Sequence, residues 1–130
     1  MAATVSQPDL KVEIGAVWWL PQELTFYPGG KGRFCLVVAL ETSAERVPVR
    51  AHYVAGSTKP SGRPKIVVEA GEANLSERTY FSFWWSNDIG IPTLVACGKL
   101  IGCIDPARHP EINAAIRAGK RAALKKLVGR

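Results

Sequence analysis

The sequence contains few cysteines and histidines, three and two respectively in 130 residues. The three cysteines are odd in number, lie among apolar residues and form no CxxC pair, so neither a disulfide framework nor a zinc-binding cluster is expected. We expect Cys35, Cys97 and Cys103 to be small buried hydrophobic residues. Neither His52 nor His109 belongs to an HExxH-type motif, so the sequence lacks the signature of a zinc hydrolase.

Long hydrophobic runs are also absent from the sequence. No apolar run approaches the roughly 18–20 residues that span a bilayer, and residues 1–12 lack the basic and apolar regions of a signal peptide. We therefore expect a cytoplasmic protein that does not contact a membrane. A chain of this length can bury one core but hardly two. We expect one domain over residues 1–130, with residues 1–10 as a flexible tail.

Acidic residues are scarce in the last quarter of the chain. Residues 1–98 hold nine Lys/Arg and nine Asp/Glu, whereas residues 99–130 hold eight and two, so the net charge of +6 comes from the C-terminal end. A basic surface favours an acidic or nucleic-acid partner. A terminal helix with a solvated cationic face explains the same charges equally well.

Short apolar segments between turn-rich ones predict a mainly β protein. Residues 12–20 (VEIGAVWWL) are rich in β-branched and aromatic residues and end at Pro21, which favours a strand. Residues 33–41 (RFCLVVALE) are almost continuously apolar, which predicts a strand buried on both faces. Residues 47–55 (VPVRAHYVA) alternate in polarity, which predicts a strand with one exposed face. The inward residues are expected to be Val47, Val49, Ala51 and Tyr53, and the outward ones Arg50 and His52.

Three further segments complete the expected sheet, and a helix closes the chain. Strands are predicted within residues 65–70, 79–85 and 93–98, and five or six strands at this spacing suggest a small barrel. Asp105 is a plausible N-cap with Pro106 at the first helical position. The helix that follows is predicted to be amphipathic and to pack on the barrel through Ile112, Ala115, Ile116, Gly119, Ala123 and Leu127.

Arg33 stands where a glycine-rich segment meets a buried strand. Residues 27–38 read YPGGKGRFCLVV, and PGGKG lacks the spacing and the Ser/Thr of a phosphate-binding P-loop. A guanidinium is always charged and its planar fork fits two phosphate oxygens, so Arg33 is well placed to hold a phosphodiester. Taken alone, an arginine that caps the strand and pairs with a surface carboxylate is the commoner arrangement.

Three polar residues farther along the chain are suited to the same chemistry. A histidine has an unperturbed pKa of about 6.5, so His52 is a candidate for proton transfer near neutrality. The hydroxyls of Ser57 and Thr58 are suited to donating hydrogen bonds to a phosphate oxygen as charge develops. An exposed strand histidine and a turn stabilised by hydroxyl-to-backbone hydrogen bonds are the alternatives.

Four stretches together resemble the MazF/PemK toxin family. Residues 14–20 (IGAVWWL) resemble the family's GdvWwv opening, and residues 29–38 (GGKGRFCLVV) resemble its Gly/Arg/Pro segment before the second strand. Residues 53–60 (YVAGSTKP) occupy the place of its Thr/Ser-bearing strand end, and residues 98–127 resemble its closing helix. The chain departs from the pattern at Phe34, where the family commonly has proline, and the family's second arginine has no counterpart that we can place.

The resemblance implies a fold, an activity and partners. The fold would be mainly β with a C-terminal helix: a small SH3-like (MazF/CcdB-type) β-barrel of five to seven strands, usually a homodimer. The activity would be that of a type II toxin, a metal-independent and sequence-selective endoribonuclease that cleaves single-stranded RNA to 2′,3′-cyclic phosphate and 5′-hydroxyl ends. No cofactor is implied. The partners would be mRNA and a cognate acidic antitoxin.

The resemblance also assigns roles to residues. Arg33 aligns with the family's catalytic arginine, and Thr58, or Ser57 as a close second, falls at its catalytic hydroxyl. His52 is the best available proton carrier. RNA-binding roles are expected for cations along the strands, the glycine loop and an aromatic residue that stacks a base: Gly30, Lys31, Gly32, Arg50, Lys59, Arg63, Lys65, Trp85 and Asn87.

Two other classes of protein remain open. CcdB-type proteins share the expected fold, bind DNA gyrase and cleave nothing. An inactive SH3-like module that recruits a protein or a nucleic acid is the third possibility. Cleavage of RNA by the purified protein separates the first class from both alternatives.

Overall fold

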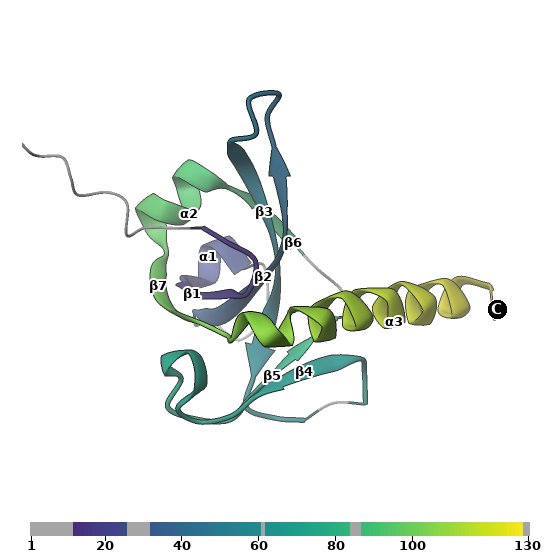
Figure 1. The fold of residues 1–130 in the computed structure, drawn as a ribbon. Helices are drawn as coiled ribbons and strands as arrows, with labels where there is room; N and C mark the ends of the chain where they lie inside the picture. Colours follow the sequence, from purple (N-terminus) through teal and green to yellow (C-terminus); the bar gives the residue numbers. More distant parts are fainter. Residues whose placement is uncertain (1–11, 26–31, 61, 84–86, 129–130) are drawn as a thin grey trace, which may run out of the picture.

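The computed structural model describes residues 12–25, 32–60, 62–83 and 87–128. Seven strands form a curled sheet, and the long helix α3 lies across it at the C-terminal end (Figure 1). The elements in chain order are β1 (Ala16–Leu20), α1 (Gln22–Thr25), β2 (Arg33–Thr42), β3 (Pro48–Ser57), β4 (Lys65–Val68), η3 (Glu72–Asn74), β5 (Thr79–Ser82), β6 (Asn87–Gly90), α2 (Ile91–Cys97), β7 (Lys99–Cys103), η4 (Pro106–Arg108) and α3 (His109–Val128). The predicted fold class, mainly β with a C-terminal helix, is confirmed.

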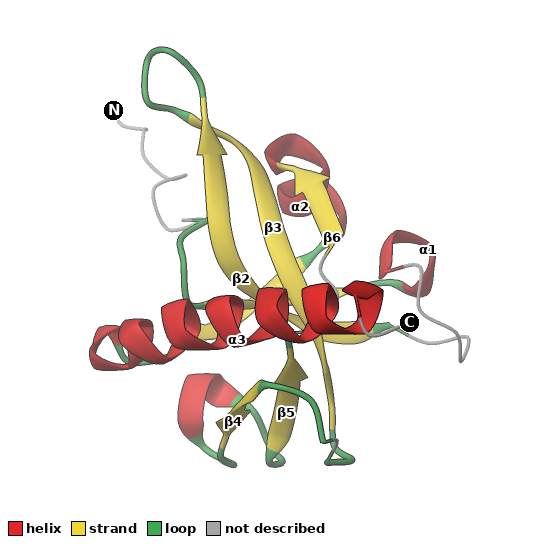
Figure 2. Cartoon of the chain, turned by 90° about the vertical axis from the view of Figure 1, so that its right-hand side faces the viewer, coloured by secondary structure: helices red, strands yellow, loops and turns green. Residues whose placement is uncertain are grey.

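The strand β3 joins two parts of the sheet. The strand order is β4-β5-β3-β2-β1-β7, every pairing is antiparallel, and β6 pairs with β3 beside this path. The N-terminal half of β3 pairs with β6, whereas Gly56 and Ser57 at its end pair with β5 (Figure 2). The C-terminal end of β3 therefore leaves one part of the sheet and enters the other, and the residues that follow it lie at the junction.

The central strands β1 and β2 are buried on both faces. Val17 and Leu36 pack into a core cluster on the side of α3, and Trp18 and Val37 pack into a second cluster with residues of α1 and α2. Successive residues of a strand point to opposite faces, so a strand between two cores must be apolar at every position. The prediction from the continuous apolar run is confirmed for residues 35–38, which are all buried.

The packing of α3 also follows the predicted pattern. Asp105 caps η4, where its Oδ1 accepts a hydrogen bond from the backbone N–H of Ala107 (2.9 Å). Ile112 and Ala115 are buried in the core against the sheet. Gly119 lies against the backbone of Phe83 so closely that a β-carbon would collide with the carbonyl oxygen. The side chains of Ala123 and Leu127 fall outside the described part of the chain.

The strand predicted within residues 93–98 is wrong, because these residues belong to the helix α2. Pro92 lies in its first turn, where a missing N–H costs nothing, and Gly98 ends it by donating a backbone hydrogen bond to the carbonyl of Leu94 (2.8 Å). The strand β6 lies in the predicted loop just before α2, and β7 lies just after it. The β-branched residues favoured a strand, but burial of Leu94 against the second core stabilises the helix.

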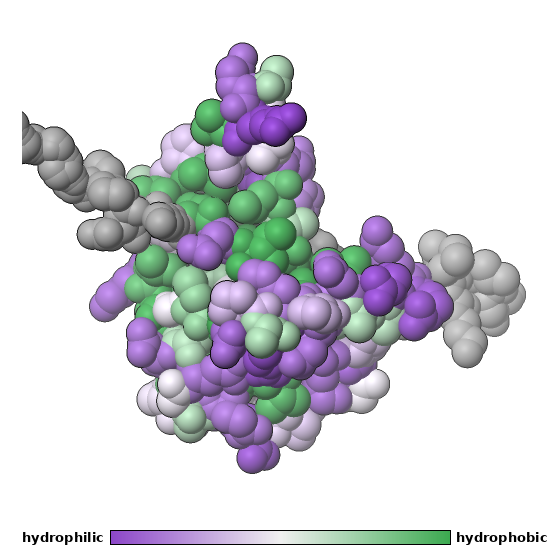
Figure 3. Space-filling model, viewed as in Figure 1, coloured by the Kyte–Doolittle hydropathy of each residue, from purple (hydrophilic) through white to green (hydrophobic). Residues whose placement is uncertain are grey.

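Two burial predictions are also wrong. Cys35 is buried as expected, but Cys97 and Cys103 are exposed. Val47 and Val49 are 55% and 46% exposed rather than inward, because the hairpin between β2 and β3 projects beyond the rest of the molecule (Figure 1). Its tip carries both hydrophilic and hydrophobic side chains (Figure 3). Only the continuation of the alternating pattern, Ala51 and Tyr53, reaches the core.

Candidate functional site

A pocket of about 480 Å³ opens where the beginning of β2 meets the end of β3. It brings together two stretches that lie more than twenty residues apart in the sequence, and it adds two residues from the segment that leads into β5. The lining residues are Gly32, Arg33, Phe34, Gly56, Ser57, Thr58, Lys59, Glu77 and Thr79. The pocket thus contains the predicted arginine and both predicted hydroxyls.

The sheet positions Arg33 at the mouth of this pocket. Arg33 begins β2 opposite Leu20 of β1, and the pairing of Cys35 with Ala55 brings the start of β2 to the end of β3. The Arg33 guanidinium donates a hydrogen bond from Nη1 to the carbonyl oxygen of Gly56 (3.3 Å). A guanidinium has five N–H donors in a fixed fork, and this bond helps to orient the group at the pocket.

The end of β3 presents two hydroxyls and a cation in one turn. The backbone N–H of Lys59 donates a hydrogen bond to Oγ of Ser57 (3.1 Å), which holds the turn closed. A hydroxyl that accepts in this way keeps its own O–H to donate. Thr58 and Lys59 are exposed and Ser57 is half-buried. The turn stabilised by a hydroxyl-to-backbone hydrogen bond, which the sequence offered as an alternative to a catalytic role, is therefore present. The same turn brings Ser57, Thr58 and Lys59 to the pocket.

Close packing leaves no room for side chains at two of the lining positions. A β-carbon on Gly56 would lie 2.6 Å from Cγ2 of Thr79 and 2.8 Å from Cε1 of Phe81. A β-carbon on Gly32 would collide with the indole ring of Trp19 and would lie 2.6 Å from the carbonyl oxygen of Leu20. Glycine at both positions lets the backbone approach these neighbours closely.

Glu77 is a lining residue that the sequence did not reveal. It precedes β5 in a turn-rich segment, and its backbone carbonyl accepts a hydrogen bond from Oγ1 of the buried Thr79 (3.0 Å). An acidic residue in such a segment is ordinarily a solvated surface group. Its contact with the pocket arises only because β5 pairs with the end of β3, a register that local sequence does not specify.

The thiol at the base of β2 contributes no nucleophile. Burial raises the pKa of the Cys35 thiol above its ordinary range, and the nearby positive charge of Arg33 offsets this only in part. The thiol Sγ lies 3.7 Å from the carbonyl oxygen of Arg33, to which it donates a weak hydrogen bond. A protonated thiol is a poor nucleophile, so the chemistry of the pocket must come from the guanidinium, the hydroxyls and the carboxylate.

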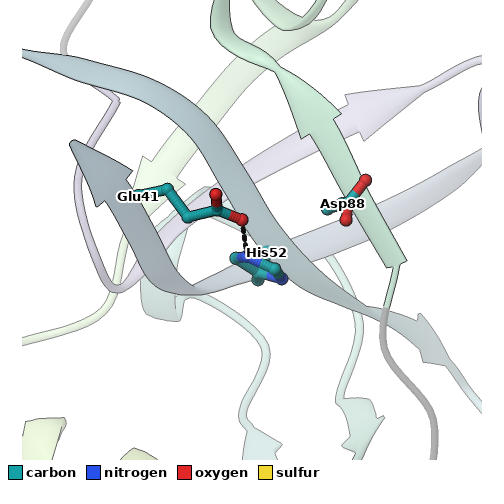
Figure 4. Close-up of side chains that lie close together, drawn as sticks. All are labelled: Glu41, His52 and Asp88. Atoms are coloured by element: carbon teal, nitrogen blue, oxygen red, sulfur yellow. Dashed lines mark hydrogen bonds and ion pairs between the residues drawn. The ribbon is translucent and has the colours of Figure 1, made fainter. Parts of the chain in front are cut away.

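His52 lies outside this pocket, on the part of β3 that pairs with β6. Its Nε2 is 2.6 Å from Oε2 of Glu41 on β2, and Asp88 of β6 lies on the other side of it (Figure 4). Arg50 donates a hydrogen bond from Nη2 to Oδ1 of Asp88 (2.9 Å). The structure therefore does not bring the predicted proton carrier to the predicted catalytic arginine.

The remaining predicted RNA-binding residues fall into three groups. Gly32 and Lys59 line the pocket. Arg63, Lys65 and Asn87 are not among its lining residues, and each makes an interaction with another part of the protein. Gly30, Lys31 and Trp85 lie outside the described residues.

No helix in the described part of the chain is long and apolar enough to cross a bilayer.

Comparison with known proteins supports the fold through structure rather than sequence. No protein-family model matches the sequence, and no curated protein matches it. A solved structure described as Mycobacterium tuberculosis toxin MazF-mt6 matches with a TM-score of 0.61 and 16% sequence identity, covering 82% of this chain and 96% of that one. The chain therefore has a MazF-like toxin fold.

Proposed function

We propose that the protein is the toxin of a type II toxin-antitoxin pair and acts as an endoribonuclease on single-stranded RNA. One observation carries this proposal. An open pocket is lined by Arg33, Ser57, Thr58 and Glu77, on a fold that the chain shares with a solved MazF toxin. These are the groups that cleavage of a phosphodiester by its neighbouring 2′-hydroxyl requires, and no metal ion has a necessary part in that reaction.

The scissile phosphate would lie between Arg33 and the turn at the end of β3. The Arg33 fork binds two phosphate oxygens, and the hydroxyls of Thr58 and Ser57 donate to the oxygen on which charge develops. Lys59, on the same turn, neutralises an adjacent phosphate. Because Arg33 is tied to Gly56 and Ser57 to Lys59, the donors are arranged before the substrate arrives. Preorganised donors stabilise charge in the transition state without a reorganisation cost.

In the chemical step the attacking 2′-oxygen loses a proton and the departing 5′-oxygen gains one. The 2′-oxygen attacks phosphorus, the bond to the 5′-oxygen breaks, and a 2′,3′-cyclic phosphate and a 5′-hydroxyl result. Glu77 is the acidic residue among those that line the pocket, so we assign to it the proton from the 2′-hydroxyl, the role that the sequence had suggested for His52. The departing 5′-oxygen takes up a proton from water.

The partners follow from the same proposal. A free ribonuclease would damage its own cell, so a cognate antitoxin must mask the pocket. Since Arg33 and Lys59 are the cations that line it, we expect an acidic antitoxin segment there. The homodimer and the cytoplasmic location remain predictions.

The test is cleavage of a defined single-stranded RNA by the purified protein in EDTA. The proposal expects discrete cuts, whereas a protein that inhibits gyrase by binding, or an inactive SH3-like module, would leave the RNA intact. Glu77→Gln, which removes the base but keeps the shape, is expected to slow cleavage by roughly 10²- to 10⁴-fold. The matched control is Glu45→Gln, the same change at the exposed hairpin tip, and it should leave the rate unchanged. Equal rates for the two variants would remove Glu77 from the mechanism.

A further inference from the structure

We propose that Glu41, His52 and Asp88 form a binding site for a divalent cation of the zinc class, separate from the pocket. The three side chains lie close together on three neighbouring strands, with Glu41 on β2, His52 on β3 and Asp88 on β6 (Figure 4). Each offers one ligand atom, and these atoms all lie within 4.8 Å of one another. The site is independent of the proposed ribonuclease chemistry, which uses none of these residues.

The sheet itself fixes this arrangement. His52 lies directly opposite Asp88 in the β3–β6 ladder, and Glu41 lies opposite the neighbouring Arg50 in the β2–β3 ladder. A register irregularity in β2 between Val37 and Ala39 sets which β2 side chains face His52. Cα positions held by backbone hydrogen bonds leave only side-chain rotations to be made on binding. A cation would therefore meet ligands that are already gathered.

The distances suit a small transition-series cation. Zinc binds nitrogen and oxygen at about 2.0–2.2 Å, which puts tetrahedral ligand atoms roughly 3.4 Å apart. His52 Nε2 and Glu41 Oε2 are now 2.6 Å apart, in a hydrogen bond that a cation would replace, and the ligand atom of Asp88, within 4.8 Å of the other two, needs to approach by at most about 1.4 Å. One imidazole with two carboxylates favours zinc and its neighbours over calcium or magnesium, which prefer oxygen ligands alone.

Solvent reaches the cluster, so the cation can enter and water can complete its coordination. The side chains of Glu41, His52 and Asp88 are 53%, 32% and 44% exposed. Three protein ligands with one open position is the arrangement in which zinc retains a water. A bound cation would link β2, β3 and β6 at the base of the projecting hairpin and would stabilise that part of the sheet.

Arg50 would compete with a cation for Asp88. Its guanidinium donates to Oδ1 of Asp88 (2.9 Å), in an ion pair whose side chains are 46% and 44% exposed. Exposed ion pairs are weak, so a cation can displace this one or take the other carboxylate oxygen. The positive charge nevertheless opposes a second cation. Arg50→Met should therefore bind zinc more tightly than the natural chain, an effect that a merely structural cluster would not produce.

The experiment titrates the untagged full-length protein, stripped with EDTA and desalted, with zinc chloride in a calorimeter, and repeats the titration with calcium chloride. We expect one zinc per chain, no calcium heat, and a rise in the thermal midpoint with zinc. His52→Ala should abolish the binding, and Glu41→Gln and Asp88→Asn should each weaken it by more than about tenfold, the least effect typical of losing even an outer-sphere partner. His109→Gln, at the other histidine, is the matched control and should bind normally.

Circular dichroism of each variant shows whether it is folded. If His52→Ala does not fold, Glu41→Gln still tests the proposal. Zinc binding that survives in His52→Ala, an affinity that Glu41→Gln leaves unchanged, or weak binding of several ions per chain would overturn the proposal. So would a weaker affinity in Arg50→Met. Because Arg33→Ala should bind zinc normally while failing to cleave RNA, the two proposals can fail separately.

Discussion

Replacing Arg33 with alanine should remove RNA cleavage while leaving the fold intact. Arg33 lines the pocket at the start of β2, and its guanidinium donates a hydrogen bond to the carbonyl of Gly56 (3.3 Å). Losing one preorganised donor to a developing charge costs about 2.7–4 kcal/mol of transition-state stabilisation, or roughly 10²- to 10³-fold in rate. Arg33 would supply two such donors and a full charge, so we expect the cleavage rate to fall by at least the upper value of this range.

The effect on folding should be much smaller. An intramolecular hydrogen bond contributes about 0.5–1.5 kcal/mol net, against the 5–15 kcal/mol by which domains are typically stable. Arg33→Ala should therefore remain folded at 25 °C with a slightly lower midpoint. Arg33→Lys keeps the charge without the planar fork, and we expect an intermediate rate.

The assay is single-turnover cleavage of a labelled RNA, followed together with growth inhibition on expression. The control is Arg46→Asn at the hairpin tip, which also removes one positive charge. Arg46 has a positive φ of 63°, and asparagine tolerates that conformation well. If Arg33→Ala cleaves as fast as Arg46→Asn, the guanidinium has no part in the chemistry and the reasoning is refuted.

Three other changes test the packing and electrostatics of the pocket. Gly56→Ala should destabilise the fold by about 1–3 kcal/mol, measured by urea unfolding, because its β-carbon would lie 2.6 Å from the methyl group of Thr79; an unchanged midpoint would contradict the close packing. Cys97 is exposed and should react with a thiol reagent in the native protein, whereas Cys35 should react only on unfolding, because it is buried and burial raises the pKa of its thiol. Equal modification rates for the two thiols would show that β2 opens in the native protein. Lys59→Ala should lower the slope of log affinity for RNA against log salt by about 0.7, the value for one phosphate contact with a single strand; the same slope in both proteins would place Lys59 off the RNA path.

The sequence was most informative where one physical requirement dominated. Residues 35–38 of β2, which include Leu36 and Val37, are all apolar because they lie between two cores, whereas the charged residues of this strand stand toward its ends. The cap at Asp105 was also predictable from the sequence, because its hydrogen bond joins it to Ala107, only two positions away in the chain. The helix α2 was not predicted, because its β-branched residues favour a strand, whereas its burial against the second core through Leu94 is a tertiary contact.

The site was predictable in its chemistry but not in its neighbours. Arg33, Ser57 and Thr58 stand at strand ends that the resemblance could align, and the structure brings them to one pocket. Glu77 and the partners of His52 come from strands that meet only through tertiary pairing. Sequence spacing carries no signal for such contacts, so the sequence suggested His52 on β3 as the proton carrier and contained no reason to consider Glu77.

The central claim is that the Arg33 pocket promotes attack of the RNA's own 2′-hydroxyl on the adjacent phosphate. Mass spectrometry of the cleaved RNA ends tests this claim most directly. A defined RNA and the same RNA with a single 2′-deoxynucleotide on the 5′ side of the cut would be incubated with the protein in EDTA. The account predicts 2′,3′-cyclic phosphate and 5′-hydroxyl ends from the first and no cut at that position in the second. Equal cleavage of both, or 5′-phosphate ends, would contradict it.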